Sequence, residues 1–580
     1  MDSTPAIQPG TAILPPADFP VDWPRPEDST FHWTRDCEHN PHPITPMFAS
    51  FAALTAGAGR ALTVEPYQEA ILARDDRQFN GFNYTRVILF DGSPEEIAAR
   101  ARRNREIVGR ISLRLPEIWQ NEWKPELEAL HDFWRNFDLA GATFSGLAAH
   151  LETSIANATR LYEIHYRMGP PMWFALDEFE QFYCDIFPDA TRLDAHRLLR
   201  GFSNQTLAIN RHLWQLSRTA RRSPVVRLLL CEMSPARART ELERMPEGRH
   251  FLGALDAFLQ AFGHRSDLWD WGYPSWAEDP APVFSTLRAY LLQPERNLDA
   301  ALMKTTADRQ QAVAEARAVL DSYPAQVIGQ FERLLRAAQV ALALTEDHTY
   351  YIDFNGFGWV RRVIAELGRR LAGQNRLNRP ADVFYLTIGE LHNMTSDRDL
   401  NFARRAADRA AEIARWQNFP APAELGTRPA APLRIYSADG RRMARYLGCW
   451  VAGDEAGQAG FLAYDNNPVP VEACQVLHGQ PGSGGVVRGR ARVITSLADA
   501  DRLQAGDILV TTTTAPPWTP LFLTASGLVT DAGGLLSHGA VVAREFRLPA
   551  VVGTRIATAA LQDGDWIEVD GNAGLVRLLA

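Results

Sequence analysis

His538 is the residue whose surroundings are most specific for chemistry in this chain of 580 residues. It follows Gly533, Gly534 and Ser537, and residues 527–530 before this turn have the apolar pattern of a short strand. Ser537 is a suitable N-cap residue for a helix that begins directly after it. The sequence therefore predicts a strand, a glycine turn and a helix, with the imidazole at the N-terminus of the helix.

The N-terminus of a helix favours an anion because free backbone N–H groups and the helix dipole present positive charge there. The same field disfavours an imidazolium, so we expect a neutral, nucleophilic His538 near pH 7. Such a histidine can attack a phosphorus atom and then hold the phosphoryl group. Arg544, further along the helix, would pair with the phosphate. The alternative is a buried histidine that only caps the helix.

This segment resembles the phosphohistidine (swivelling) domain of the phosphoenolpyruvate-utilising (PEP-utilising) enzymes. The family pattern is roughly T-D-x-G-G-x-x-S-H-x-A-x-x-A-R-E, and residues 530–545 match it at every specified position. The resemblance implies a β/β/α domain with His538 as the phosphoryl carrier and with Thr530, Gly533 and Gly534 around the phosphate. Flanking segments match as well, namely residues 482–490, 507–511, 548–553 and 569–574.

The composition indicates a multidomain globular protein, with 46% hydrophobic and 22% charged residues. A net charge of -9 at pH 7 and the lack of a basic stripe argue against a nucleic-acid partner. The five cysteines are scattered without a C-x-x-C pair, which indicates reduced thiols and no zinc site. No signal peptide is evident and no apolar run approaches membrane-spanning length. We therefore expect a cytoplasmic protein with no membrane partner, and the sequence assigns no metal ligands while leaving metal binding open.

The sequence contains no recognisable nucleotide-binding loop. It has no G-x-x-x-x-G-K-[ST] motif, and its only lysines are Lys124 and Lys304. The ATP-grasp module that normally heads the PEP-utilising enzymes is not visible, nor is the C-terminal barrel that binds pyruvate in phosphoenolpyruvate synthase. We therefore expect ATP and Mg²⁺ to bind to a separate ATP-grasp subunit.

Four segments follow from the changes in composition along the chain. Apolar residues at helical spacing and a capping box at Ser93 predict a mainly α-helical domain. Short strands with glycine turns predict the β/β/α domain, and a Pro-rich stretch around Pro420–Pro429 predicts a connector. The expected organisation is an extended N-terminal segment, a helical substrate domain, a linker with short β pieces and the phosphohistidine domain, over residues 1–30, 31–430, 431–472 and 473–580.

The helical part resembles the substrate domain of rifampin phosphotransferase and the histidine-bearing large subunit of phenylphosphate synthase. The runs that carry this resemblance are residues 38–46, 262–266 with 273–280, and 346–353 with 367–371 and 380–387. The layout therefore resembles rifampin phosphotransferase without its ATP-grasp domain.

Two polar pairs in these runs could serve phosphoryl transfer to a hydroxyl group. His264 and Arg265 follow a glycine and could position the acceptor hydroxyl and neutralise the incoming phosphate. Glu346 and His348 lie at the end of a long predicted helix and could supply a general base. The alternative is structural, with Arg265 and Glu346 as an ion pair and the histidines as helix caps.

These features together predict a phosphotransferase subunit that carries phosphohistidine at His538. The family's chemistry implies that a partner cleaves ATP to AMP and phosphate and leaves a phosphoryl group on this histidine. The domain would then swing to the helical part and phosphorylate a hydroxyl of an aromatic, phenol-like substrate. Two alternatives remain open: another alcohol or an antibiotic as acceptor, or a phosphocarrier or regulatory protein without a small-molecule acceptor. A closed aromatic pocket would favour the enzyme, and a solid helical core would favour the carrier.

Overall fold

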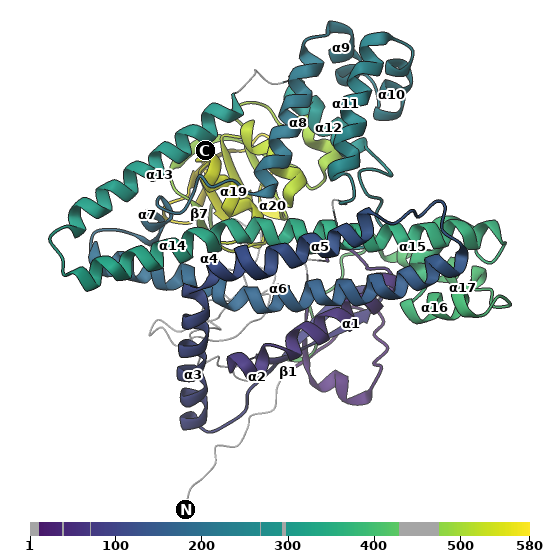
Figure 1. Cartoon of the computed structure of the whole chain (residues 1–580), viewed down its shortest axis with the longest axis horizontal. Coiled ribbons are helices and arrows are strands. Elements are labelled where there is room, and N and C mark those ends of the chain that lie inside the picture. Colours follow the sequence, from purple (N-terminus) through teal and green to yellow (C-terminus); the bar gives the residue numbers. More distant parts are fainter. Residues whose placement is uncertain are drawn as a thin grey trace, which may run out of the picture.

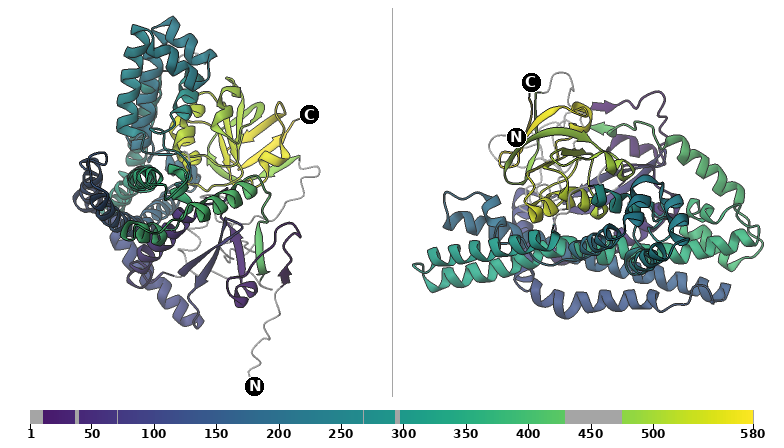
Figure 2. Two further views of the ribbon diagram at one scale, coloured as in Figure 1. Left: turned by 90° about the vertical axis from the view of Figure 1, so that its right-hand side faces the viewer. Right: turned by 90° about the horizontal axis from the view of Figure 1, so that it is seen from above.

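A mainly helical part is followed by a C-terminal sheet domain, as the sequence predicts (Figure 1). The structure is a computed structural model that describes residues 11–36, 40–69, 71–266, 268–292, 297–428 and 475–579. The C-terminal domain and an N-terminal sheet lie on the same side of a layer of long helices (Figure 2). The site described below lies where these three parts meet.

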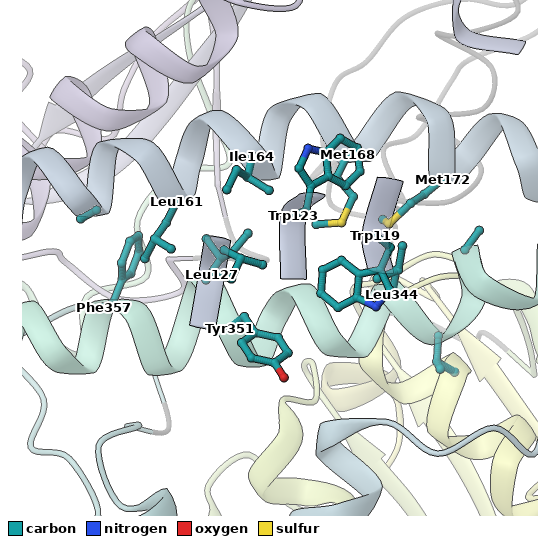
Figure 3. Close-up of a cluster of buried hydrophobic side chains, with 14 of the residues drawn as sticks. Trp119, Trp123, Leu127, Leu161, Ile164, Met168, Met172, Leu344, Tyr351 and Phe357 are labelled. Carbon is teal, nitrogen blue, oxygen red and sulfur yellow. The ribbon is translucent and has the colours of Figure 1, made fainter. Parts of the chain in front are cut away.

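The long helices owe their packing to apolar stripes and to defined ends. The central pair is α6 (Phe144–Ile186) and α14 (Ala325–His348), and the side chain of Thr143 caps the first of them. After α14 the chain continues without a break through one π-helical turn, η3 (Thr349–Phe354), into α15 (Asn355–Gly373). Figure 3 shows the apolar side chains that fill the space between α6 and this continuous rod. The rod therefore forms one rigid wall of the molecule.

The remaining helices cover this core or extend from it. The predicted capping box at Ser93 is confirmed, and it opens α3 (Pro94–Leu113). A second apolar core holds together a group of helices that stands away from the long pair in Figure 1. That group contains α8 (Gln205–Arg221), α9 (Pro224–Glu232), α10 (Pro235–Glu243), α11 (Pro246–Phe262) and α12 (Ala281–Leu292). Others include α1 (Pro46–Ala61), α5 (Lys124–Arg135), α13 (Leu298–Leu320), α16 (Ile388–Ser396) and α17 (Ala403–Trp416).

An antiparallel sheet inside the predicted helical region was not expected from the sequence. Its strand order is β1-β5-β2-β4-β3. The hairpin at one edge of this sheet joins β3 (Ile71–Phe79) to β4 (Phe82–Leu89) through Asn80 and Gly81, both at positive φ. An Asn-Gly pair favours this two-residue turn because both positions tolerate a left-handed backbone. The other strands are β1 (Thr11–Ile13), β2 (His32–Arg35) and β5 (Glu424–Arg428).

Two predicted segment boundaries change as a result. The N-terminal segment contributes β1, so it is not merely extended. The predicted connector around Pro420–Pro429 contains β5, which pairs with both β1 and β2 and buries Leu425. The predicted linker over residues 431–472 lies outside the described residues.

The C-terminal domain is built on an eight-stranded mixed sheet in the order β6-β13-β12-β8-β9-β10-β11-β7. Its centre is parallel, and β9 (Ile508–Thr511) and β10 (Gly527–Thr530) are buried at every residue. Strands buried in this way carry continuous apolar runs because both faces of the sheet are covered. The predicted strand over residues 527–530 is therefore confirmed. The remaining strands are β6 (Val476–His478), β7 (Gln480–Ser483), β8 (Val486–Val493), β11 (Ala550–Val552), β12 (Trp566–Asp570) and β13 (Leu575–Leu578).

The stretch Pro46–Tyr67 is long and apolar enough to cross a membrane, with a mean hydropathy of 1.3. The expectation that no apolar run approaches that length was therefore wrong for this stretch. Its first helix, α1, packs Phe51 against Trp271 and Phe357, with ring centroids 4.4 and 5.1 Å apart. This is the packing of a helix in a protein core.

We expect Gly358→Ala to destabilise the protein. Gly358 lies in α15 where that helix touches the backbone at His264, and an added Cβ would lie 2.0 Å from the His264 carbonyl oxygen. Overpacking of this kind typically lowers the free energy of unfolding by about 1–3 kcal/mol. Gly373, at the end of the same helix, has no atom within 4 Å of an added Cβ and serves as the matched control. Thermal unfolding should show a lower Tm for Gly358→Ala alone. Equal Tm values for the two variants would contradict this packing.

Candidate active site

His538 is the first residue of α19 (His538–Phe546), and its ring lies between the two parts of the molecule. Its Nδ1 is 3.1 Å from Oε2 of Glu346, which comes from α14 in the helical part. Its Nε2 is 3.0 Å from Oγ1 of Thr519, which belongs to the same domain as the histidine. Two residues predicted independently from distant motifs thus meet in space.

The hydrogen bonds determine which ring nitrogen can react. Burial raises the pKa of Glu346, but the charge and hydrogen bond of His538 and a hydrogen bond from Thr206 outweigh it, so the pKa lies below its usual value. An ionised carboxylate only accepts hydrogen bonds, so Nδ1 of His538 carries the proton. When the ring is neutral, Nε2 keeps its lone pair, and the Thr519 hydroxyl can donate to it. Nε2 is therefore the nucleophilic nitrogen in this arrangement.

A cavity of about 1260 Å³ opens beside this pair. The C-terminal domain, the long helices and strand β3 all contribute to its wall, and Glu346, His348 and His538 line it. The remaining wall combines aliphatic, polar and charged side chains with these aromatic residues: Phe48, Tyr162, Tyr166, Trp173, Trp269, Tyr273, Phe354 and Trp518. The helical part therefore has a hollow aromatic site facing His538 and is not a solid bundle.

The loop after β9 faces the same cavity and was not predicted as part of the site. Thr511, Thr512, Thr513 and Thr514 all line the cavity. A Cβ added to Gly539 would lie 2.7 Å from Oγ1 of Thr514, so this loop passes close to the start of α19. A run of four threonines after a buried strand was the available signal, because hydroxyl groups can donate to phosphate oxygens.

The glycine turn before His538 has a structural role. Gly533 has a φ of 113°, and a Cβ there would lie 2.8 Å from the Ser537 hydroxyl. Ser537 occupies the predicted N-cap position, but its hydroxyl donates to the carbonyl of Gly534 at 2.8 Å and does not cap the helix. Thr530 is buried and donates to the carbonyl of Ala532 at 2.7 Å. Thr530, Gly533 and Gly534 do not line the cavity, whereas Ser537 does.

Arg544, predicted as a phosphate partner, lies outside the cavity in this arrangement. Its buried guanidinium donates to the carbonyl of Gly482 at 2.8 Å and to the carbonyl of Leu535. These bonds tie α19 to β7 and to the glycine turn. Arg544 does not line the cavity, so it positions the turn that carries His538.

His264 and Arg265 are not brought to His538. The ring of His264 lies 3.9 Å from that of Trp359, and burial lowers its pKa to about 3. The guanidinium of Arg265 lies between the rings of Trp276 and Phe354, 5.0 Å from each. Neither residue lines the cavity. The sequence pattern there reflects a tightly packed bend against α15.

A polar interface around α19 holds the C-terminal domain against the helical part. Glu545 accepts hydrogen bonds from the backbone N–H of Gly201 with both carboxylate oxygens, at 3.0 and 2.8 Å. Its backbone carbonyl accepts from Thr305 at 2.9 Å. Arg547 forms an ion pair with Asp308 of α13. Burial raises the pKa of Glu545 to about 7.

Comparison with known proteins agrees with this arrangement. Residues 503–574 match the mobile domain of PEP-utilising enzymes, and residues 178–346 match the fourth domain of rifampicin phosphotransferase. The C-terminal domain, called the mobile domain below, thus resembles the mobile domain of the PEP-utilising enzymes, and the resemblance predicted from the sequence is confirmed. Glu346 is the last residue of the second match, and His538 lies inside the first.

Three relatives extend the likeness over more of the chain. Chondramide synthase cmdD of Chondromyces crocatus is 35% identical over 575 residues, which is 97% of this chain and 14% of that protein. The uncharacterized phosphotransferase YvkC of Bacillus subtilis is 25% identical over 93% of this chain and 60% of its own length. Rifampicin phosphotransferase of Streptomyces sviceus is 34% identical over 59% of this chain and 36% of its own length. The chain thus spans less than two thirds of each of these relatives.

We expect the contact between the mobile domain and the helical part to weaken as the pH rises from about 4.5 through about 7. A carboxyl group whose pKa is raised at an interface stabilises the contact when protonated, and this contribution is lost once it ionises. Energy transfer between dyes on the mobile domain and on α13 should fall over this pH range.

The variant Glu545→Gln cannot ionise and should show a much smaller pH effect. Glu568→Gln, at an exposed ion pair with Arg488 within the mobile domain, is the control and should behave as the unmodified protein. An unchanged pH profile in Glu545→Gln would show that another group controls the contact.

Proposed function

We propose that this chain is the acceptor-binding component of a phosphotransferase that carries phosphohistidine at His538. It would pass the phosphoryl group to a hydroxyl of a large, mainly apolar acceptor. The observation that supports this most directly is the hydrogen bond between His538 and Glu346 at the edge of a large aromatic cavity. One part of the molecule supplies the group and the other supplies the binding site.

The phosphoryl group would come from ATP on a separate ATP-grasp subunit with Mg²⁺, leaving AMP and phosphate. This part of the proposal rests on the family resemblance and on the relatives, which are longer than this chain. The mobile domain would turn away from the helical part to collect the group and return to deliver it. Water must be excluded at both positions, because a phosphohistidine is otherwise hydrolysed. We expect this cycle to take place in the cytoplasm.

Transfer would proceed by attack of the acceptor oxygen on the phosphorus atom. The P–O bond forms as the bond between phosphorus and Nε2 of His538 breaks, and the electron pair returns to Nε2. Glu346 keeps the proton on Nδ1, so the imidazole leaves as a neutral ring. The hydroxyl proton would pass to Nε2 of His348, which lies with Asp353 at the polar wall of the cavity. Glu346 therefore serves the leaving group, which differs from its predicted role as the base.

The cavity favours an acceptor larger than a simple phenol. Sites for small organic molecules typically measure about 300–1,000 Å³, and this cavity has about 1260 Å³. Its aromatic wall suits a molecule with extended apolar or aromatic surface. Of the alternatives open from the sequence, this supports an antibiotic-like alcohol or phenol, as in the relative named rifampicin phosphotransferase. A phosphocarrier without a small acceptor would need no such hollow.

We expect His538→Ala to abolish labelling of this chain by an ATP-grasp partner and ATP, because the nucleophile is lost. His478, an exposed histidine on β6 of the same domain, provides the control variant His478→Ala. Acid-labile, base-stable label should appear on the control protein and not on His538→Ala. Label that persists without His538 would place the carrier elsewhere.

We expect Glu346→Gln to slow transfer while leaving the loading of His538 intact. A hydrogen bond to a charged group contributes about 1.5–3 kcal/mol, or roughly ten- to a hundredfold in rate. Single-turnover transfer from isolated phosphorylated protein measures this step alone. Asp347→Asn is the matched control, because Asp347 is the adjacent carboxylate on α14 but accepts from the backbone of Gln205 outside the cavity. Equal transfer rates in the two variants would remove Glu346 from the mechanism.

A further inference from the structure

Three metal-binding side chains converge on one side of the cavity. His165, His348 and Asp353 each place one ligand atom within 4.8 Å of the other two. Nδ1 of His165 is 3.7 Å from Oδ1 of Asp353, and Nε2 of His348 is 3.7 Å from Oδ2 of the same carboxylate. All three residues line the cavity that contains His538.

The π-helical turn η3 brings two of these residues together. Asp353 follows His348 by five positions, which in a regular α-helix would point the two side chains in different directions. A π-helical turn closes with i→i+5 hydrogen bonds, so residues five apart come to lie on one face. Such turns occur often at functional sites. His165 approaches from α6, and its ring stacks on Tyr162 at 5.4 Å.

The hydrogen bonds leave a lone pair of His348 directed at the carboxylate. Nδ1 of His348 lies 2.8 Å from the carbonyl of Leu344, which can only accept, so Nδ1 carries the proton. In the neutral ring the lone pair is then on Nε2. That lone pair faces an oxygen of Asp353, a residue that is 2% exposed. Two electron-rich atoms facing each other across 3.7 Å suit a cation between them.

We propose that His165, His348 and Asp353 bind a divalent transition-metal ion, for which Zn²⁺ is the best match. Imidazole and carboxylate ligands suit Zn²⁺, whereas Mg²⁺ and Ca²⁺ take oxygen ligands. Zinc–ligand distances of about 2.1 Å place two ligands of a tetrahedral ion about 3.4 Å apart. The two 3.7 Å distances run to different oxygens of Asp353, and the three ligand atoms lie within 4.8 Å of one another, so a bound ion would draw the three side chains closer together. The bond from His348 Nδ1 to Leu344 is the outer contact that typically orients a metal-binding histidine.

Three protein ligands leave one tetrahedral position for the acceptor. This role rests on the proposed phosphotransferase function, whereas metal binding itself does not. A hydroxyl oxygen bound at the open position would release its proton to solvent more readily, because the ion lowers its pKa. The oxygen would then attack the phosphorus on His538 Nε2, and the P–N electron pair would return to that nitrogen. The ion would thus activate the acceptor hydroxyl, which is the role that the sequence predicted for His348 as a general base.

Metal binding can be measured on the full chain without ATP, partner or acceptor. Protein stripped with a chelator is titrated with Zn²⁺ by calorimetry, and with Co²⁺ while the visible spectrum is recorded. We expect one ion per chain and the intense visible bands of tetrahedral Co²⁺. In the variants His165→Ala and Asp353→Asn, the Kd for Zn²⁺ should rise by at least about a hundredfold. Circular dichroism would show whether each variant is folded, and His165→Ala is the safer change because that side chain is 29% exposed.

His212 provides a matched control. Its Nδ1 lies 2.8 Å from the carbonyl of Ala208, as in His348, but it lies outside the cavity and in no such cluster among the described residues. His212→Ala should bind Zn²⁺ as the unmodified protein does. No stoichiometric binding, or equal binding by folded His165→Ala, would overturn the site.

The role of the ion is tested separately with phosphorylated protein. Removal of Zn²⁺ should slow single-turnover transfer to the acceptor by more than about tenfold and leave labelling of His538 unchanged. Zinc binding combined with an unchanged transfer rate would overturn the role in transfer. Zinc binding by a protein that never accepts label would instead overturn the phosphotransferase function while the metal site stands.

Discussion

The structure depends on a carboxylate that is buried in one part of the molecule and neutralised by the other. Glu346 is 2% exposed, and an ionised carboxylate at such a position is costly unless hydrogen bonds and charges compensate for its lost hydration. His538 supplies the largest part of this compensation from the mobile domain, and Thr206 and His348 contribute from the helical part. The domain therefore docks with its histidine in a defined orientation, because only Nδ1 toward Glu346 satisfies the buried charge.

The rod formed by α14, η3 and α15 places these polar groups on one wall while it keeps the core apolar. Leu344 and Tyr351 point into the core, where they pack near Trp119 (Figure 3). Glu346 and His348, which lie between these two residues in the sequence, face the cavity. The π-helical turn brings Asp353 to the same wall. A regular helix through this region would direct Asp353 elsewhere. The change in helical phase is thus the local feature that assembles the polar wall.

The sequence predicted the parts of the site that are encoded by short motifs. The strand, turn and helix around His538 follow from glycine and N-cap preferences, and Glu346 follows from a polar cluster at a helix end. The place of Arg544 could not be predicted, because spacing along a helix does not reveal whether a guanidinium is engaged by backbone carbonyls. His165 lies in the middle of the 43-residue helix α6 with no motif around it, so only tertiary packing reveals its place.

The sequence contains enough local information to predict part of the N-terminal sheet. It does not contain enough to predict the cavity. Asn80-Gly81 between two runs of strand-forming residues is a local hairpin signal, whereas the pairing of β1 and β2 with β5 joins segments about four hundred residues apart. Helical periodicity identifies which residues are apolar, but a hollow and a solid bundle have the same periodicity. The volume between α6, β3 and the mobile domain depends on how those elements meet in three dimensions.

The interface between the mobile domain and the helical part is consistent with a contact that forms and breaks. The apolar residues of this interface include Leu535 and Val541, which pack into the main hydrophobic core. The centre of the interface is polar. Glu545 bonds to a backbone N–H, and Arg547 pairs with a partly exposed Asp308. Water can replace such contacts at modest cost, whereas a wholly apolar interface would hold the domain permanently. A histidine that must reach two sites needs an interface specific enough to orient it and weak enough to release it.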